Sequence, residues 1–238
     1  MNAVEKDSRA HDPESDKRVL ILYFSFSGQT FGLVNHIANG LREQGATVVV
    51  EKLQPAEALH FPVDGYLATI SMMLATFFRR RVAIEELSSS CREDYDLIIL
   101  AGPTWSYNPS GPVLSLLDRN GPEIFKGQQV LPLISCRGYW RTHWFGLKSL
   151  LRKCGAATVN LMVFAHPCPE PWRTIGVFLK IAGKNPERSR LVGRYYKRFG
   201  HSRQQWDEAR RFGSLIGEAL KKKTPLAGID FKTEAALS

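Results

Sequence analysis

The sequence predicts an α/β protein with a doubly wound, five-stranded parallel sheet. Short, continuously apolar runs alternate with segments whose apolar residues recur at helical spacing, and polar, glycine-containing loops follow three of the runs. Runs without strict alternation of apolar and polar residues are typical of strands covered on both faces, as in parallel sheets. Right-handed crossovers between such strands place helices on both faces.

Five strands and four helices account for most of the pattern. The apolar runs that predict strands are residues 18–24, 47–51, 95–101, 129–134 and 157–164. The helical patterns are residues 31–44, 111–119, 144–153 and 206–221. Gly45 and Gly155 stand where two of these helices should stop, and Pro112 suits the first turn of another.

Two long connections exceed what a minimal sheet needs. Residues 66–87 and 167–203 are rich in apolar and basic side chains, and we expect helical inserts after strands two and five. Residues 1–16 are polar and charged without an apolar run, which indicates a disordered N-terminal arm. The expected organisation is therefore one domain over residues 17–223, followed by a C-terminal tail over residues 224–238.

Composition narrows the functional classes. The 238-residue chain is 44% hydrophobic and 23% charged, ordinary for a globular protein, and has no run of about 18 apolar residues that would predict a membrane span. Its four cysteines lack metal-binding spacing, so we expect reduced thiols, no metal site and a cytoplasmic location. The net charge of +9 suits an anionic ligand, an anionic membrane or a merely solvated basic face, and no nucleic-acid-binding motif accompanies it.

The loop after the first strand is the strongest signal. It consists of Ser25, Phe26, Ser27, Gly28, Gln29 and Thr30. It opens the first helix, so backbone N–H groups and the helix dipole favour an anion there, and its hydroxyls can donate to phosphate oxygens. Without a lysine or a nucleotide-binding glycine motif, it suits a monophosphate better than a triphosphate or a pyrophosphate. An ordinary serine-rich N-cap turn is the alternative.

Loops after strands three and four carry aromatic side chains. The first contains Pro103, Thr104, Trp105, Ser106 and Tyr107, and the second contains Cys136, Arg137, Gly138, Tyr139 and Trp140. In a sheet of order 2-1-3-4-5, strands one and three flank the point where the winding reverses, so these loops meet the phosphate loop in one crevice. A monophosphate site beside planar apolar side chains predicts flavin mononucleotide (FMN).

The same residues carry a family resemblance. S-x-S-G-Q-T after the first strand and P-T-W after the third resemble the FMN site of flavodoxins and flavodoxin-like NAD(P)H-dependent oxidoreductases, over residues 17–166 and 204–222. The resemblance implies a flavodoxin-like fold, with Ser25, Ser27, Gly28, Gln29 and Thr30 holding the phosphate. It also implies that residues 103–107 and 136–140 frame the isoalloxazine ring.

A narrower resemblance concerns the substrate. Y-D-L-I-I-L at 95–100, T-W-x-x-x-P-S-x-P-V-x-S-L-L at 104–117, I-S-C-R-x-x-W at 134–140 and A-x-R-F-G at 209–213 resemble bacterial dialkylresorcinol condensing enzymes. That group implies aromatase-type oxidation of an alkylated cyclohexanedione to a resorcinol. Proton removal beside a carbonyl would then need a base, and His143 and Tyr107 are the candidates.

The sequence therefore predicts an FMN-dependent oxidoreductase that acts on a small, lipid-like cyclic dione or quinone, with NAD(P)H as a candidate reductant. The alternatives are an electron-transfer flavodoxin without its own substrate and a flavodoxin fold that has lost FMN. The two inserts are compatible with a roof over the site, an alkyl-chain site, a homodimer interface, contact with an anionic membrane, or simple core packing.

Overall fold

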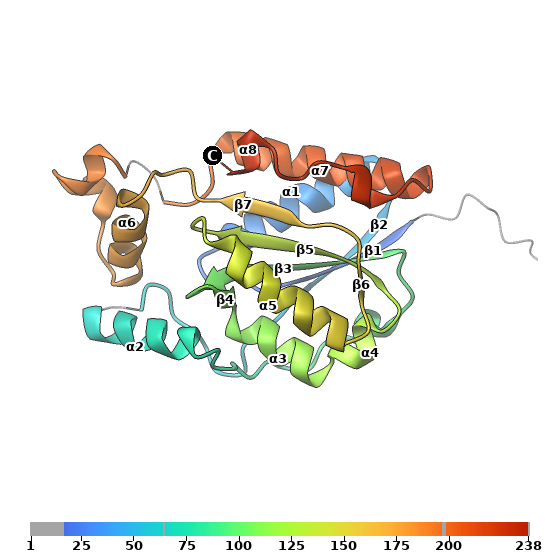
Figure 1. Cartoon of the computed structure of the whole chain (residues 1–238), viewed down its shortest axis with the longest axis horizontal. Coiled ribbons are helices and arrows are strands. Elements are labelled where there is room, and N and C mark those ends of the chain that lie inside the picture. The colour runs from blue at the N-terminus through green and yellow to red at the C-terminus, as the bar shows by residue number, and fades with distance from the viewer. Residues whose placement is uncertain (1–16, 64, 197–198, 238) are drawn as a thin grey trace, which may run out of the picture.

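The computed structural model describes residues 17–63, 65–196 and 199–237. Its centre is a twisted sheet with helices on both faces (Figure 1). The predicted N-terminal arm, residues 1–16, lies outside the described residues.

Five parallel strands form the predicted order. The sheet runs β2 (Thr47–Lys52), β1 (Arg18–Tyr23), β3 (Leu97–Trp105) and β5 (Gln129–Cys136), and both β6 (Ala157–Thr158) and β7 (Met162–Ala165) pair with β5 in parallel. The expected fifth strand is thus present in two pieces, and a short β4 (Asn108–Pro109) adds an antiparallel hairpin to β3. The prediction of a doubly wound parallel sheet is confirmed.

Each face of the sheet buries its own apolar cluster. On one face, α1 (Gln29–Glu43) and α7 (Arg203–Lys221) pack against alternate sheet residues such as Ile21 and Ile99. On the other face, α3 (Gly111–Arg119), α4 (Gly121–Phe125) and α5 (Trp140–Lys153) cover the intervening residues. Because successive side chains of a strand point to opposite faces, covering both faces produces the continuous apolar runs of the sequence.

Helix α1 is placed by close contact with α7. A Cβ on Gly40 would overlap the carbonyl oxygen of Arg210, and a Cβ on Gly213 would overlap the carbonyl oxygen of Ile37. The two helices therefore touch backbone to backbone, where only glycine fits. This contact sets where the N-terminus of α1 lies at the edge of the sheet.

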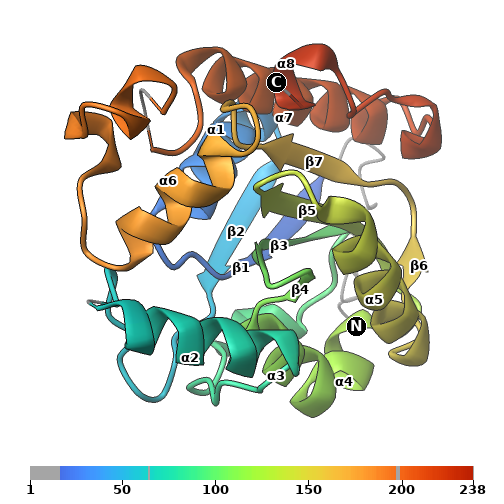
Figure 2. The ribbon, with the colours of Figure 1, turned by 60° about the vertical axis from the view of Figure 1, so that its left-hand side comes forward.

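The two inserts lie together at the carboxyl edge of the sheet. They contain α2 (Tyr66–Phe77) and α6 (Trp172–Ile181), the latter followed by the short helices η2 (Pro186–Arg188) and η3 (Val192–Arg194). The ring of Tyr66 stacks on that of Phe178 at 6.0 Å, which joins α2 to α6 (Figure 2). The first insert is helical only as far as Phe77. Beyond Arg79, whose φ is +57°, the backbone runs without α-helix to the short η1 (Ser89–Arg92).

The segment after α7 differs from the expected tail. Through η4 (Leu226–Gly228) and α8 (Glu234–Leu237) it returns to the sheet, and Leu226, Phe231 and Ala236 are buried in the cluster beneath α1 and α7. These three apolar side chains are too widely spaced to form a recognisable helical or strand pattern. Their packing against the sheet makes this segment part of the domain.

Candidate functional site

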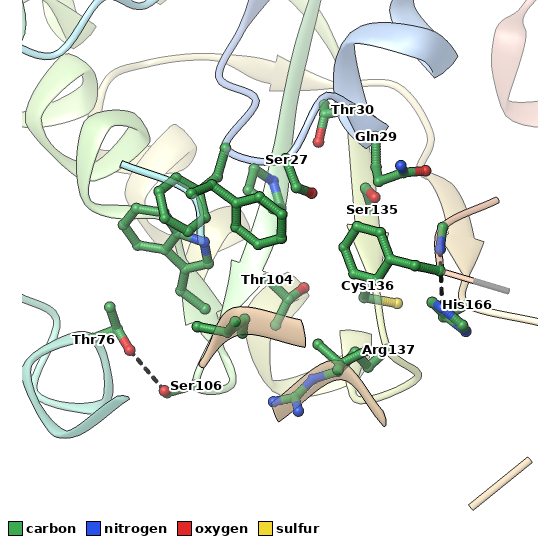
Figure 3. Close-up of a pocket in the computed structure, with 18 of the residues that line it drawn as sticks. Ser27, Gln29, Thr30, Thr76, Thr104, Ser106, Ser135, Cys136, Arg137 and His166 are labelled. Carbon is green, nitrogen blue, oxygen red and sulfur yellow. Dashed lines mark hydrogen bonds between the residues drawn. The ribbon is translucent and has the colours of Figure 1, made fainter. Parts of the chain in front are cut away.

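A cavity opens where β1, β3, β5 and β7 end. Its wall takes residues from the loop after β1, from the ends of β3 and β5, from the segment after β7, and from both inserts. Figure 3 shows Ser27, Thr30, Thr104, Ser135 and Cys136 arranged around this space. The crevice at the point of reversed winding thus brings together the three loops that the sequence analysis singled out.

The loop after β1 contributes hydroxyl groups and a helix N-terminus. Ser27 and Thr30 line the cavity, as does Phe26. Gly28, at the N-cap of α1 with φ +80°, does not line the cavity and has no side chain to cap the first turn. Ser25 does not line the cavity either; its Oγ accepts a hydrogen bond from the backbone N–H of Phe31 at 3.2 Å and thereby shapes the loop.

Gln29 lines the cavity but is engaged with the protein. Its Oε1 accepts a hydrogen bond from the backbone N–H of His201 at 3.0 Å. A Cβ on Gly200, where φ is +91°, would overlap the Gln29 side chain. Gln29 therefore holds the segment at residues 199–201 as a wall of the cavity.

The β3–β4 hairpin supplies the second wall. Pro103, Thr104, Trp105 and Ser106 line the cavity, and the Trp105 ring contacts Phe26 edge-on at 5.5 Å between centroids. Ser106 and Tyr107 have φ values of +42° and +70°. Residues other than glycine avoid this left-handed region, so the surrounding contacts must hold the turn in place.

Asn108 provides most of those contacts. Its Nδ2 donates to the carbonyl oxygens of Phe77, Ser106 and Thr76 at 3.0, 3.1 and 3.3 Å, and its Oδ1 accepts from Arg79 Nε at 2.8 Å. The Ser106 hydroxyl lies 2.7 Å from that of Thr76. This buried group of hydrogen bonds holds the C-terminal end of α2 against the Trp105 wall.

His143 does not reach the cavity. It is buried on α5, and its Nδ1 lies 2.7 Å from the Oγ1 of Thr104, which does line the cavity. Burial lowers the pKa of His143 to about 3, so the ring is neutral at neutral pH. The expected acid–base candidate is thus placed behind Thr104, where it fixes that hydroxyl.

The end of β5 supplies a thiol and a cation. Cys136 and Arg137 line the cavity, and burial raises the pKa of the Cys136 thiol to about 12. Burial also lowers the pKa of the Arg137 guanidinium, which is half-buried. Within the described residues, no group accepts a hydrogen bond from this guanidinium. Since removing a cation even partly from water is costly without a hydrogen-bond partner, Arg137 is suited to an anionic or oxygen-rich ligand.

The remaining expected ring contacts lie outside the cavity wall. Tyr107 and Tyr139 are half-exposed and contact each other edge-on at 5.3 Å. Gly138 is covered by the guanidinium of Arg173. Trp140 does not line the cavity; it packs against the apolar cluster of β5 and β7, beneath the cations of Arg141 and Lys232. The structure thus separates residues 138–140 and Tyr107 from the residues that line the cavity.

Several residues that line the cavity were not predicted as site residues from the sequence. Ser135 Oγ lies 2.9 Å from His201 Nε2, and His166 Nε2 accepts from the backbone N–H of Gly200 at 3.1 Å. Burial lowers the pKa of His166 to about 4. Phe61, from the segment before α2, and Phe199, from the second insert, stack at 5.7 Å and complete the wall. Ser135 stands directly beside Cys136 in the sequence, whereas no local motif marks the other lining residues named here.

A second chamber adjoins the first beneath α2. The two share Phe26, Met72, Thr76 and Trp105 as wall residues. The second chamber is otherwise lined mainly by small and apolar side chains from residues 56–63, α2 and residues 80–83. An apolar part of a ligand in the first cavity can therefore find a compatible surface next to it.

Solved structures share this architecture. A flavodoxin from the domain Archaea matches with a TM-score of 0.50 at 14% identity, over 86% of this chain and 99% of its own. A protein from Bacteroides eggerthii described as a flavoprotein matches with a TM-score of 0.51 at 15% identity, over 71% of this chain and 100% of its own. The chain has a flavodoxin-like fold. This confirms the fold predicted from the sequence.

Sequence comparison covers a smaller part of the chain. No family model matches the chain. An NAD(P)H dehydrogenase (quinone) of Azorhizobium caulinodans is 30% identical over 118 residues, which is 46% of this chain. The chain matches about half the length, 50%, of that relative.

Two further findings concern the described residues. They contain no group of three or more His, Cys, Asp or Glu residues that could hold a metal ion. No helix among them is long and apolar enough to cross a membrane.

Proposed function

We propose that the protein is an FMN-dependent oxidoreductase that acts on a small cyclic dione or quinone-like substrate. The observation that carries the proposal is the cavity itself. It joins a hydroxyl-rich helix N-terminus to a wall containing Trp105 and to the cation of Arg137, all at the carboxyl edge of the sheet. The similarity to an NAD(P)H dehydrogenase (quinone) supports oxidation and reduction as the class of reaction.

The donor set fits the phosphate of FMN. Ser27 and Thr30 present hydroxyls to the cavity, and the N-terminus of α1 lacks a capping side chain at Gly28. A phosphate dianion there accepts hydrogen bonds from hydroxyls and backbone N–H groups and is stabilised by the helix dipole. Ser25 and Gln29 act indirectly in this assignment, because one shapes the loop and the other holds the opposite wall.

The walls suit a planar ring. Trp105 and Phe26 offer apolar surface, and Thr104, Cys136 and Arg137 offer polar atoms from two strand ends. When bound, FMN supplies hydride or electron transfer, and the protein supplies position and electrostatics. Arg137 stabilises negative charge in the cavity, and the neutral His143 keeps the Thr104 hydroxyl in one orientation.

Two expected residues receive different roles. Because Tyr107 and His143 do not line the cavity, we assign neither as the base. The Cys136 thiol stays protonated at neutral pH, since its pKa is about 12, and acts as a wall group rather than a nucleophile.

The second chamber favours a substrate with an apolar substituent. Its shared wall with the first cavity would place a hydrocarbon chain beneath α2 while a ring occupies the first cavity. An alkylated cyclohexanedione, oxidised to an aromatic resorcinol, has this combination of ring and chain. The same site also supports the opposite use of the flavin, in which NAD(P)H reduces FMN and FMN then reduces a quinone.

Anaerobic spectroscopy of the purified protein tests the proposal. We expect FMN to bind with a one-to-one stoichiometry, and a dialkylcyclohexanedione to bleach the flavin spectrum. Bleaching by NAD(P)H alone, followed by reoxidation with a quinone, selects the reductase direction. Reduction only through a separate reductase protein selects an electron-transfer flavodoxin, and failure to take up FMN refutes the proposal.

A further inference from the structure

Helix α2 carries its large apolar side chains on the outside. Thr69, Met72, Met73 and Thr76 face the protein or line its cavities. The outer stripe is exposed over its whole length and consists of Leu67, Ile70, Leu74, Phe77 and Phe78, which we call the α2 face. Leu67 is 84% exposed and Phe78 is 78% exposed. A helix at a protein surface ordinarily has the reverse arrangement.

The spacing makes the α2 face one continuous stripe. Positions 67, 70, 74 and 77 follow each other at intervals of three and four residues, so they lie on one side of the helix. No charged residue occurs between Tyr66 and Phe78. Exposed apolar surface of this kind indicates a contact surface.

Basic side chains border the stripe. Arg79, Arg80 and Arg81 follow its C-terminal end, and the Lys184 ammonium lies 5.8 Å from the Tyr66 ring at the other end. The segment after α6 projects from the same end of the molecule as α2, on the far side of α6 (Figure 2). It adds the exposed Arg188, Arg190 and Arg194 beside the exposed apolar residues Leu191 and Tyr195.

Most of this positive charge has no acidic partner among the described residues. Arg81 pairs with Asp118. For Arg80, Arg188, Arg190 and Arg194, the described part of the chain provides no ion-pair partner. The border is thus complementary to an anionic surface, and the chain as a whole carries a net charge of +9.

We propose that the α2 face docks on an anionic phospholipid bilayer. Its apolar side chains enter the boundary between headgroups and acyl chains, and the bordering arginines and lysines contact the lipid phosphates. Twelve helical residues span about 18 Å, which is too short to cross a hydrocarbon core of about 30 Å, so α2 lies in the interface. Docking would place the second chamber, which lies beneath α2, close to the membrane.

Vesicle sedimentation tests this proposal with the full chain. The probes are sucrose-loaded vesicles of phosphatidylcholine and phosphatidylglycerol at about 3:1, and vesicles of phosphatidylcholine alone, at about 0.15 M salt. We expect sedimentation with the anionic vesicles only. The substitution Phe78→Ser should weaken binding about tenfold, because a large buried apolar side chain is lost.

The chain offers a matched control on another helix. Phe145, on α5, is 72% exposed, and Phe145→Ser should leave vesicle binding unchanged. For the charges, Arg190→Gln should weaken binding roughly fivefold, whereas Arg152→Gln on α5 should have little effect. Far-UV circular dichroism checks that every variant is folded.

Three results would overturn the proposal. They are failure of the folded wild type to bind anionic vesicles, equal losses in Phe78→Ser and Phe145→Ser, and a dimer that dissociates on Phe78→Ser, which would show that a second copy covers the face. The inference is independent of the proposed chemistry, since these measurements need no flavin.

Discussion

Replacement of Asn108 by alanine tests how the first insert is held against the cavity wall. The Asn108 amide carries two N–H hydrogens, which three carbonyl oxygens share, and its Oδ1 accepts one bond from a cation. Asn108→Ala therefore removes the equivalent of two neutral bonds and one charge-assisted bond. It also leaves the Phe77 carbonyl at the end of α2 without a donor, whereas the Thr76 carbonyl still accepts from the backbone N–H of Arg79.

The expected loss of stability in Asn108→Ala follows from these contacts. A neutral bond contributes about 1 kcal/mol, and a charge-assisted bond contributes more, although the exposure of Arg79 reduces that contribution. We expect a loss of about 3 kcal/mol in the free energy of unfolding. The part of that loss confined to α2 should appear as faster amide exchange over residues 66–79.

Urea unfolding, followed by tryptophan fluorescence, measures the global change, and hydrogen exchange with mass spectrometry measures the local one. Asn120→Ala, on the α3–α4 connection away from the cavity, controls for the loss of a largely buried asparagine. A global loss below about 1 kcal/mol together with unchanged exchange over residues 66–79 would refute the reasoning.

Three further predictions concern the site. Ser27→Ala and Thr30→Val should each weaken FMN binding about tenfold in a flavin-fluorescence titration, since each removes one hydroxyl donor to a charged phosphate. Unchanged FMN affinity in both variants would contradict the placement of the phosphate beside these hydroxyls. The Cys136 thiol, with a pKa of about 12, should not react with a disulfide reagent at pH 8 in the native protein, and all four buried cysteines should react after unfolding. Because the pKa of His143 falls from about 6.5 to about 3 on folding, the unfolded chain alone binds this proton between those values. Stability should therefore decrease below pH 6.5 by about 1.4 kcal/mol per pH unit from this group. His143→Asn should flatten that dependence in urea titrations at pH 7, 6 and 5, and an equal slope in the variant would contradict the assignment.

The strands were predictable because their cause is local. A strand covered on both faces needs apolar residues at every position, and the runs at 18–24 and 129–134 show this directly. The break in the last strand was not predictable. It occurs at Asn160, whose Nδ2 donates to the carbonyls of Leu226 and Ile229, residues that reach it only after the C-terminal segment has folded back.

The site likewise contains residues whose place was predictable from the sequence and residues whose place was not. Ser27 and Thr30 lie in the turn and first helical residues after β1, and Thr104 lies at the end of β3, so position in the chain predicts position in the cavity. Tyr107 and Trp140 also follow strands, but local turns direct them elsewhere, the first through a left-handed residue and the second through the start of α5. His166 and Phe199 reach the wall through contacts between segments far apart in the sequence.

Because of the glycine contact between α1 and α7, residues far from the cavity also affect ligand binding. A saturation mutagenesis screen for ligand binding would show intolerant positions at Gly40 and Gly213, although neither glycine lines the cavity. Any side chain there pushes the two helices apart and displaces the N-terminus of α1. Binding would then be lost through geometry, with the Ser27 and Thr30 hydroxyls chemically intact.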